Sequence, residues 1–486
     1  MNRYVTVHGH FYQPPRENPW TGEVDEEVTA RPYHDWNERI TAECYAPNAP
    51  NYARMSFNFG PTLLAWLEAN AADTYEAILA ADRASRERFS GHGSALAQAY
   101  NHAILPLAVG RDKTTQVAWG IRDFERRFGR RPEGMWLPET AVDDETLEVL
   151  AAEGIAFTVL APSQAAAVRE PSSRWIELDG GGIDPREPYR VPLPSGRTIT
   201  VFFYDGGLSH GIAFGELARS GTDFARALLS RLDDRSGPQL VHVATDGETY
   251  GHHFRGADRA LGEALARIES SGEARLTNYG EFLARFPPRL EARIVPRSSW
   301  SCAHGVGRWT DDCGCSAGAA VRHPWRRPLR EALDWLRDTL APLYSAAGAA
   351  LFTDPWAARN DSIELFLDPS PASIDRFFER NSIGALSEDE RSTGLGLLQL
   401  QRYAVLMYTS CGWFFDDPAG LETRQVLRYA ARAVELAEEQ LGGSIEPLFL
   451  RLLERVRSVS GDRPDASELY RNLRAPFTPS AAVLPS

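Results

Sequence analysis

Up to about residue 290, the chain alternates short runs of β-branched or aromatic residues with longer amphipathic stretches. Parallel strands need a crossover connection, usually a helix, so this alternation predicts a parallel sheet covered by helices. We predict seven strands, which favours an α/β fold with a closed or nearly closed (β/α) barrel. The predicted strands span Tyr4–His10, Arg88–Ala95, Gly134–Glu139, Ala156–Ala161, Thr198–Asp205, Leu240–Asp246 and Arg275–Asn278. The predicted helices span Thr62–Ala81, Asp112–Phe128, Asp143–Ala152, Asp223–Leu232 and Ala257–Glu269.

Beyond Pro287 and Pro288 the pattern changes to one amphipathic helix after another, with no clear strand. Helical spacing is visible in Pro328–Ala346, Ala372–Arg380, Leu397–Met407, Leu421–Gln440 and Ile445–Arg457. We therefore predict two domains, an incomplete TIM-like barrel of seven strands over residues 1–290 and an all-α domain over residues 291–486. The length of 486 residues leaves room for both.

Charge and composition narrow the classes of partner. A net charge of −14 repels phosphate backbones and anionic lipid, so we expect neither nucleic acid nor a membrane as a partner. No apolar stretch near the N-terminus has the form of an export signal. Five cysteines, an odd number in a long chain, suit a reducing compartment. We expect a cytoplasmic protein, and the sequence leaves its oligomeric state open.

In a barrel of parallel strands, the carboxyl ends of the strands meet at one rim, where active sites are built. The long connections Phe11–Asn58 and Pro162–Arg197 leave such strand ends. Polar residues predicted at the rim are His8, His10, His92, Glu139, Asp205, Asp246 and Glu248. Two of them, Glu139 and Asp246, come from separate strands, as the nucleophile and the general acid/base of a glycosidase do. Taken singly, Glu139 also suits a helix cap and Asp246 a turn.

Aromatic residues accompany these carboxylates. Trp136, Tyr250, Trp300, Trp309 and Trp413 are candidates for stacking on sugar rings, while polar groups hold hydroxyls. An oligosaccharide or polysaccharide is therefore the predicted ligand.

His8 and His10 alternate along one strand, so their side chains should point to the same face. Binding of substrate hydroxyls is the first interpretation. A metal site that includes Asp246 is the second, because two histidines and an aspartate make a workable ligand set for a hydrolase. Histidines satisfied within the core are the third.

Cys302, His304, Cys313 and Cys315 place four nitrogen or sulfur donors within a short segment, enough for a tetrahedral zinc site. Their spacing is unusual for zinc knuckles, which use Cys-x-x-Cys turns. From the sequence alone we favour buried thiols that shape a loop over zinc, and we regard redox chemistry as the weakest of the three.

As a set, these motifs resemble family 57 glycoside hydrolases, retaining enzymes that act on α-glucans through a seven-stranded barrel followed by a helical bundle. The segment from His8 to Pro14 resembles the first conserved region of the family. The segment Gly93–Pro106, with Gln98, Tyr100 and His102, is similar to the second. The resemblance implies that Glu139 is the nucleophile and Asp246 the acid/base, and that no metal or other cofactor is needed.

The region from about Arg293 resembles an uncharacterised C-terminal domain found in one subgroup of this family. In the wider family the helical part helps to close the active site. The resemblance thus implies that Arg308, Trp309, Trp413 and Asp416 line the substrate cleft, while burial in a core is equally open for the two tryptophans. We also expect His8, His10, Gln13, Trp136, His253 and Trp300 to bind substrate.

Two departures from the family pattern stand out. Phe11 and Tyr12 separate His10 from Gln13, where many members have His-Gln-Pro directly. His252 and His253 follow Gly251, where members often present a bulky aromatic residue.

The expected activity is that of an amylase or a 4-α-glucanotransferase. A metal-dependent carbohydrate deacetylase or mannosidase and a glycan-binding protein without catalysis are the alternatives.

Overall fold

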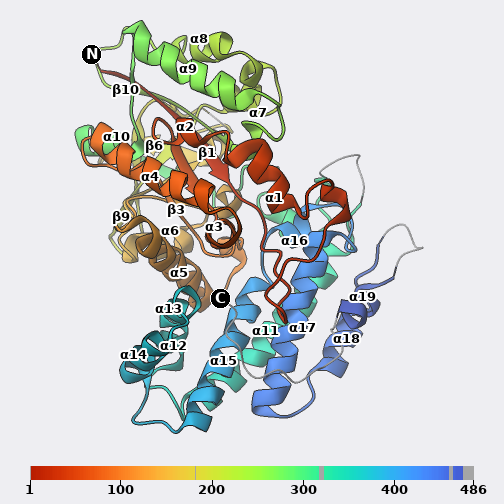
Figure 1. Ribbon diagram of the computed structural model, residues 1–486. Helices are drawn as coiled ribbons and strands as arrows, with labels where there is room; N and C mark the ends of the chain where they lie inside the picture. Colours follow the sequence, from red (N-terminus) through yellow and green to blue (C-terminus); the bar gives the residue numbers. More distant parts are fainter. Residues whose placement is uncertain (1, 181, 317–321, 459–463, 474–486) are drawn as a thin grey trace. The chain divides into compact units, whose positions relative to one another are not determined.

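A computed structural model describes residues 2–180, 182–316, 322–458 and 464–473 (Figure 1). The chain forms two compact units. The first comprises Met1–Gln13, Glu26–Tyr100 and Phe124–Ser301, and the second comprises Pro14–Asp25, Asn101–Asp123 and Cys302–Ser486. Within the described residues, no helix is long and apolar enough to span a bilayer.

The first unit is a mixed α/β structure. Its strands are β1 Arg3–Phe11, β2 Ser56–Phe59, β3 Ala97–Gln98, β4 Met135–Trp136, β5 Phe157–Leu160, β6 Ala165–Arg169, β7 Ile176–Glu177, β8 Pro188–Pro192, β9 Thr198–Phe203, β10 Gln239–Asp246, β11 Arg275–Leu276 and β12 Leu290–Ile294. Its helices are α1 Trp36–Ile40, α2 Ala49–Tyr52, α3 Pro61–Asn70, α4 Ala72–Arg88, α6 Asp144–Ala152, α7 Gly206–Ala213, α8 Gly221–Leu229, α9 Ala257–Ser271 and α10 Tyr279–Arg285. Helix α5, Gly110–Phe128, runs across the boundary between the two units along the chain.

Six of the seven predicted strands overlap an observed one, and the strand predicted over Arg88–Ala95 is wrong. That segment begins at the last residue of α4 and continues through a turn in which Ser90 and Gly91 have φ values of 55° and 95°. Two successive left-handed residues end a helix and cannot continue as a strand. The strand β3 begins two residues later, and β2, β6, β7, β8 and β12 were not predicted. The single helix predicted over Thr62–Ala81 is two helices, because Ala71 leaves the helical conformation.

Among the described residues, the strands pair in three separate sheets. Strand pairing within the sheets therefore does not close into one seven-stranded ring. Strand β1 has parallel neighbours in β10, β2 and β11. Strand β3 pairs with β4, and β5 pairs with β9. The sheet continues from β9 through β8, β12, β6 and β7, with antiparallel pairing except between β8 and β12, which are parallel. Bridges between Phe57 and Ala95 and between Gly134 and Phe157 connect the three sheets. A bond from Asp205 N to His242 O, at 2.9 Å, joins the end of β9 to β10.

The core of the first unit lies among these strands. Aromatic rings dominate it, among them Tyr4, Trp136, Phe157, Phe202 and Tyr279. Every residue of β1 after Arg3 is buried, so both faces of this strand are covered. Such burial is typical of a parallel strand with neighbours on both sides and helices outside.

The second unit is helical apart from short turns and isolated bridges among its described residues. Its helices are α11 Arg326–Gly348, α12 Pro355–Asp361, α13 Ile363–Leu367, α14 Pro371–Asn381, α15 Glu388–Leu406, α16 Cys411–Phe414, α17 Leu421–Leu441, α18 Glu446–Leu453 and α19 Ala466–Leu473. Figure 1 shows α11, α15 and α17 side by side, and these helices pack against one another. Each contributes residues to the buried core, such as Leu333, Leu400 and Val434. All five helices predicted in this region are confirmed.

Candidate active site

Strand pairing places polar residues of separate strands side by side near the carboxyl ends of the strands. In register, His10 of β1 lies between Asp246 of β10 and Asn58 of β2. Gln98 of β3 lies opposite Trp136 of β4. These residues stand at or near the carboxyl ends of their strands, the end at which parallel barrels place their chemistry.

Glu139 follows β4 within the turn η4, Pro138–Thr140. Its φ of 57° lies in the left-handed region, which costs a residue with a side chain about 1 kcal/mol or more. Such strain persists only where the surroundings enforce it. The carboxylate oxygen Oε2 accepts a hydrogen bond from Trp300 Nε1 at 3.1 Å and another from the hydroxyl of Ser301. The turn thus presents a half-buried carboxylate with two donors on one oxygen.

A hydrogen-bonded network holds this turn in place. The side chain of Gln164 accepts from Thr140 Oγ1 and donates to Thr140 O, both at 2.8 Å. The same amide group donates to Ser298 Oγ at 3.1 Å. Val142 pairs with Ser298 through the backbone, and Trp300 N donates to Glu139 O at 3.1 Å. The segment that carries Trp300 and Ser301 is therefore fastened to the turn that carries Glu139.

Asp246 ends β10 and is reachable by solvent, although protein atoms crowd around its carboxyl group. This crowding displaces much of the water that would stabilise a carboxylate and raises the pKa of Asp246 to about 7, with the negative charge of Glu139 as the second cause. The two carboxyl groups therefore interact electrostatically. A group with this pKa carries a proton part of the time at neutral pH and can deliver it to a leaving group.

Glu248 lies two residues beyond Asp246 and is buried. Its Oε1 accepts hydrogen bonds from Tyr45 Oη at 2.6 Å and from Tyr12 N at 3.1 Å. Burial, and then the charge of Asp246, raises the pKa of Glu248 to about 8. At neutral pH this side chain is mostly protonated, so it adds little negative charge beside Asp246.

His8 and His10 point to the same face of β1, as the alternation predicted, and Asn58 contacts both. His8 Nε2 donates to Asn58 Oδ1 at 3.1 Å, and Asn58 Nδ2 donates to His10 Nδ1 at 3.0 Å. Burial lowers the pKa of each histidine to about 3. Both imidazoles are therefore neutral at neutral pH, and they act as hydrogen-bonding groups rather than as cations.

The rings of these histidines stack on Trp136. The ring centroids of His8 and Trp136 are 4.7 Å apart, and those of His10 and Trp136 are 5.1 Å apart. Trp300 packs edge-on against Trp136, also at 5.1 Å. Trp136 is fully buried, whereas Trp300 is only half-buried. Trp300 can therefore be reached from solvent, and Trp136 lies beneath it.

The chain that carries these carboxyl groups and histidines matches a known protein family. The family model described as glycosyl hydrolase family 57 matches residues 51–294, which is half of the chain. The chain belongs to glycosyl hydrolase family 57. A second model, described as a domain of unknown function (DUF3536), matches residues 322–482 in the helical region of this family 57 chain.

Curated relatives of the family 57 chain include the 4-alpha-glucanotransferases of Thermococcus litoralis and Thermococcus kodakarensis. Each is 24% identical to it, over 297 and 296 residues, which is 60% of this chain and 40% of each relative. The chain thus spans less than half the length of these curated relatives.

Solved structures with the same fold include an exo-type maltose-forming amylase from Pyrococcus sp. ST04, with a TM-score of 0.73 and 15% identity over 97% of this chain and 88% of that one. The family 57 branching enzyme of Pyrococcus horikoshii has a TM-score of 0.63 and 16% identity over the whole of both chains. At these identities the likeness is one of fold.

The remaining predicted residues of the first unit lie close in sequence to those above. Gln13 is half-buried, and its amide donates to Tyr12 O at 3.0 Å. His253 is exposed. Its neighbour His252 makes an ion pair or hydrogen bond with Glu43 at 2.6 Å.

Four predicted residues belong to the helical unit, and three of them, Arg308, Trp309 and Trp413, are buried. The fourth, Asp416, is half-buried, and its Oδ1 lies 2.8 Å from His323 Nε2. Trp309 Nε1 donates to Ser410 O and Trp413 Nε1 donates to Arg326 O, each at 3.2 Å. Arg308 donates to Phe414 O at 3.1 Å and lies over the Phe414 ring. Of the two interpretations for the tryptophans, burial in a core describes their surroundings, so we do not count Arg308, Trp309 and Trp413 among the residues that contact sugar.

A metal site built on His8, His10 and Asp246 receives no support from the geometry. Within the described ranges, one group of histidine, cysteine and acidic residues has converging donor atoms, and its members are Cys302, His304, Cys313 and Cys315. The histidines of β1 instead use their ring nitrogens on Ser56 and Asn58.

Sequence reasoning missed the residues that support the site, namely Asn58, Gln164, Ser298 and Ser301. Asn58 could have been found from the alternation Ser56, Phe57, Asn58, Phe59, which is typical of a short strand. For Gln164 no signal exists in the sequence, because its partners lie 24 and 134 residues away.

Proposed function

We propose that this family 57 chain is a retaining glycoside hydrolase or transglycosylase that acts on α-linked glucans, of the amylase or 4-α-glucanotransferase type. Glu139 attacks the anomeric carbon while Asp246 protonates the departing glycosidic oxygen. The resulting covalent glycosyl-enzyme is released by water or by the hydroxyl of a second sugar, after Asp246 takes up a proton from that acceptor.

One observation carries this proposal: two carboxyl groups that interact electrostatically have surroundings suited to opposite roles. Glu139 receives two hydrogen bonds on one oxygen, which suits an ionised nucleophile, whereas the pKa of Asp246 is raised to about 7, which suits a proton donor. A carboxyl group with a raised pKa beside a second carboxyl group is typical of acid/base catalysis.

The substrate class follows from the relatives. The names of the curated and solved relatives describe 4-alpha-glucanotransferases and amylases, so an oligosaccharide or polysaccharide of α-linked glucose is the expected substrate. We assign sugar contacts to Trp300, His10, Gln13 and His253 and a supporting role beneath them to His8 and Trp136. The proposal includes a cytoplasmic location and no nucleic acid or membrane partner.

For the fold, we propose a seven-stranded barrel. Its strands are β1, β2, β3, β4, β5, β9 and β10, and the bridges between their sheets connect them. Along the chain, we propose a catalytic domain over residues 1–290 and a helical domain over residues 291–486. The compact units differ from this division, because Pro14–Asp25 and Asn101–Asp123 belong to the helical unit and residues 291–301 to the first.

The test is product analysis with maltooligosaccharides. We expect Glu139→Gln to lower turnover by at least about 1000-fold, because the nucleophile is lost. Glu145→Gln is the matched control, since Glu145 is an exposed glutamate on the neighbouring helix α6 and should leave turnover unchanged. The first product of the wild-type chain should keep the α configuration, as monitored by proton NMR.

Several outcomes would contradict the proposal. Inversion of configuration would exclude the covalent route, and loss of activity on chelation would favour the metal-dependent alternative. Binding of glucan without any turnover would indicate a glycan-binding protein. In a complex with substrate, the two carboxyl groups should lie about 5–5.5 Å apart, and a separation of about 6.5–9.5 Å would indicate an inverting pair.

A further inference from the structure

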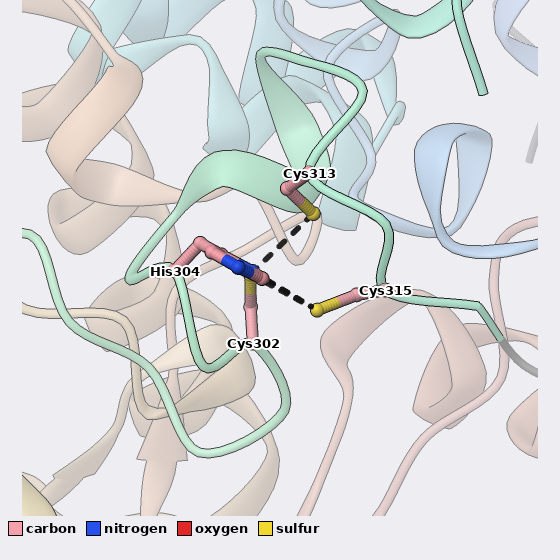
Figure 2. A group of neighbouring side chains, drawn as sticks. All are labelled: Cys302, His304, Cys313 and Cys315. Atoms are coloured by element: carbon pink, nitrogen blue, oxygen red, sulfur yellow. Dashed lines mark hydrogen bonds between the residues drawn. The ribbon is translucent and has the colours of Figure 1, made fainter. Parts of the chain in front are cut away.

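A cluster of four nitrogen and sulfur donors lies in the second unit and contains none of the residues assigned to catalysis. Figure 2 shows Cys302, His304, Cys313 and Cys315 with their side chains pointing toward one another. Their donor atoms all lie within 4.8 Å of each other, and the three cysteines are free thiols. Two segments of chain contribute to the cluster, one on each side of the short turn η8, Gly307–Trp309.

The distances in the cluster match a tetrahedral zinc ion. Bond lengths of about 2.3 Å to sulfur and about 2.05 Å to nitrogen require roughly 3.8 Å between two sulfurs and roughly 3.6 Å between sulfur and nitrogen. Cys302 Sγ lies 3.8 Å from Cys313 Sγ and 3.7 Å from Cys315 Sγ. Cys315 Sγ lies 3.5 Å from His304 Nδ1. A disulfide would need two sulfurs about 2.05 Å apart, which neither sulfur pair approaches.

Backbone N–H groups point at two of the sulfur atoms. The N–H groups of His304 and Arg308 donate to Cys302 Sγ, and that of Ala303 donates to Cys315 Sγ. Such donors stabilise a sulfur that has lost its proton to a metal, although burial raises the pKa of the Cys302 thiol, to about 12, while no ion is bound. Gly314, with a φ of 82°, stands between Cys313 and Cys315 and reverses the chain so that both side chains turn to the same point.

A buried positive charge beside the cluster also suits a metal site with thiolate ligands. The guanidinium of Arg326 is fully buried, donates to Cys315 O at 2.9 Å and interacts electrostatically with Cys313 and Cys315. A buried cation needs compensation nearby. A zinc ion with three thiolates and one neutral histidine carries a net charge of −1, which Arg326 would balance.

We propose that Cys302, His304, Cys313 and Cys315 bind one structural Zn²⁺ ion. Four protein ligands leave no open position, so the ion stabilises the fold and does not bind substrate. Three sulfurs with one imidazole select zinc over harder cations such as Mg²⁺ or Ca²⁺. The ion ties the segment that carries Cys302 and His304 to the segment that carries Cys313 and Cys315. This inference is independent of the proposed glucan chemistry.

Metal analysis of the full-length chain tests the proposal. After expression with zinc and exhaustive dialysis, the wild-type chain should retain about one zinc per chain, and the double variant Cys313→Ser/Cys315→Ser should retain none. Cys411→Ser is the matched control, because Cys411 is a cysteine of the same unit outside the cluster. Zinc-free wild-type protein, or a double variant that retains zinc, would overturn the proposal.

A second measurement on the wild-type chain avoids any variant that fails to fold. Addition of Co²⁺ to the chelator-treated chain should produce the visible absorption bands of tetrahedral, thiolate-bound cobalt, and zinc should displace them. Alkylation followed by mass spectrometry should label Cys313 and Cys315 only after chelation. Octahedral cobalt spectra, equal labelling with and without zinc, or a disulfide among these cysteines in the native chain would each contradict a zinc site.

Discussion

At the scale of single residues, the site depends on a difference between two carboxyl groups that the same protein holds near each other. Asp246 is crowded by protein atoms and repelled by Glu139, and both effects raise its pKa, to about 7. Glu139 is held in a strained turn by donors from Trp300 and Ser301. The chemistry proposed for each carboxyl group therefore follows from its neighbours rather than from its residue type.

The pKa of Asp246 predicts how activity depends on pH. Because Asp246 must carry a proton to act as the acid, kcat/KM should fall as pH rises through about 7. Replacement of Glu139 by glutamine removes a negative charge, so the pKa of Asp246 should decrease in Glu139→Gln. A carbon-13 NMR titration of the Asp246 carboxyl group measures this shift. An unchanged or higher pKa in Glu139→Gln would show that the two groups do not interact.

Substrates with different leaving groups test the role of Asp246 directly. We expect Asp246→Asn to impair hydrolysis of natural α-glucan by about 100-fold or more, and to impair an aryl glycoside with a good leaving group much less, because that group departs without a proton. Steady-state kinetics on both substrates provides the comparison. Equal losses on the two substrates would argue that Asp246 is not the acid.

At the scale of elements, the turn with Glu139 and the segment with Ser301 form one unit. Ser301→Ala removes a hydrogen bond to a carboxylate, which is worth about 1.5–3 kcal/mol, so we expect kcat to fall by roughly 10- to 100-fold with KM little changed. Ser301→Thr keeps the hydroxyl group and should restore most of the rate. If the alanine and threonine variants lose activity equally, the hydroxyl group does not position Glu139.

At this scale, prediction from the sequence succeeded where the alternation of residues within one strand was enough to place their side chains. The alternation of His8 and His10 predicted their shared face, and both contact Asn58 and Trp136. It failed at β3 and β7, two strands of only two residues each, because such short segments show no period. The strand β2 was missed inside a long connection, and with it Asn58, the residue that links the two histidines.

At the scale of the whole molecule, buried groups with shifted pKa values predict how stability depends on pH. Burial lowers the pKa of His8 and His10 to about 3 and that of His242 to about 4, so the unfolded chain binds protons that the folded chain does not, once the pH falls below about 6.5. Stability therefore decreases on acidification. The pKa of Glu248 is raised to about 8, so the folded chain keeps a proton that the unfolded chain releases, and stability decreases as the pH rises toward 8.

These opposite trends place the expected maximum of Tm near pH 6.5, as monitored by calorimetry of the full-length chain. In Glu248→Gln, which keeps a neutral side chain of the same size, the decrease of Tm between pH 6.5 and 8 should become smaller. An unchanged alkaline decrease in that variant would show that other groups cause it.

The sequence by itself determined the repeat of strands and helices, the change to a helical region after about residue 290, and the two carboxylates and two histidines at strand ends, because periodicity and chain order are local properties. Only the tertiary structure decided which residues meet. The contacts of Glu139 with Trp300 and Ser301, the burial of Trp309 and Trp413, and the tetrahedral distances among Cys302, His304, Cys313 and Cys315 join segments whose separation along the chain carries no record of their proximity. Hydrogen bonding, burial and metal geometry act through space, and the fold alone fixes those distances.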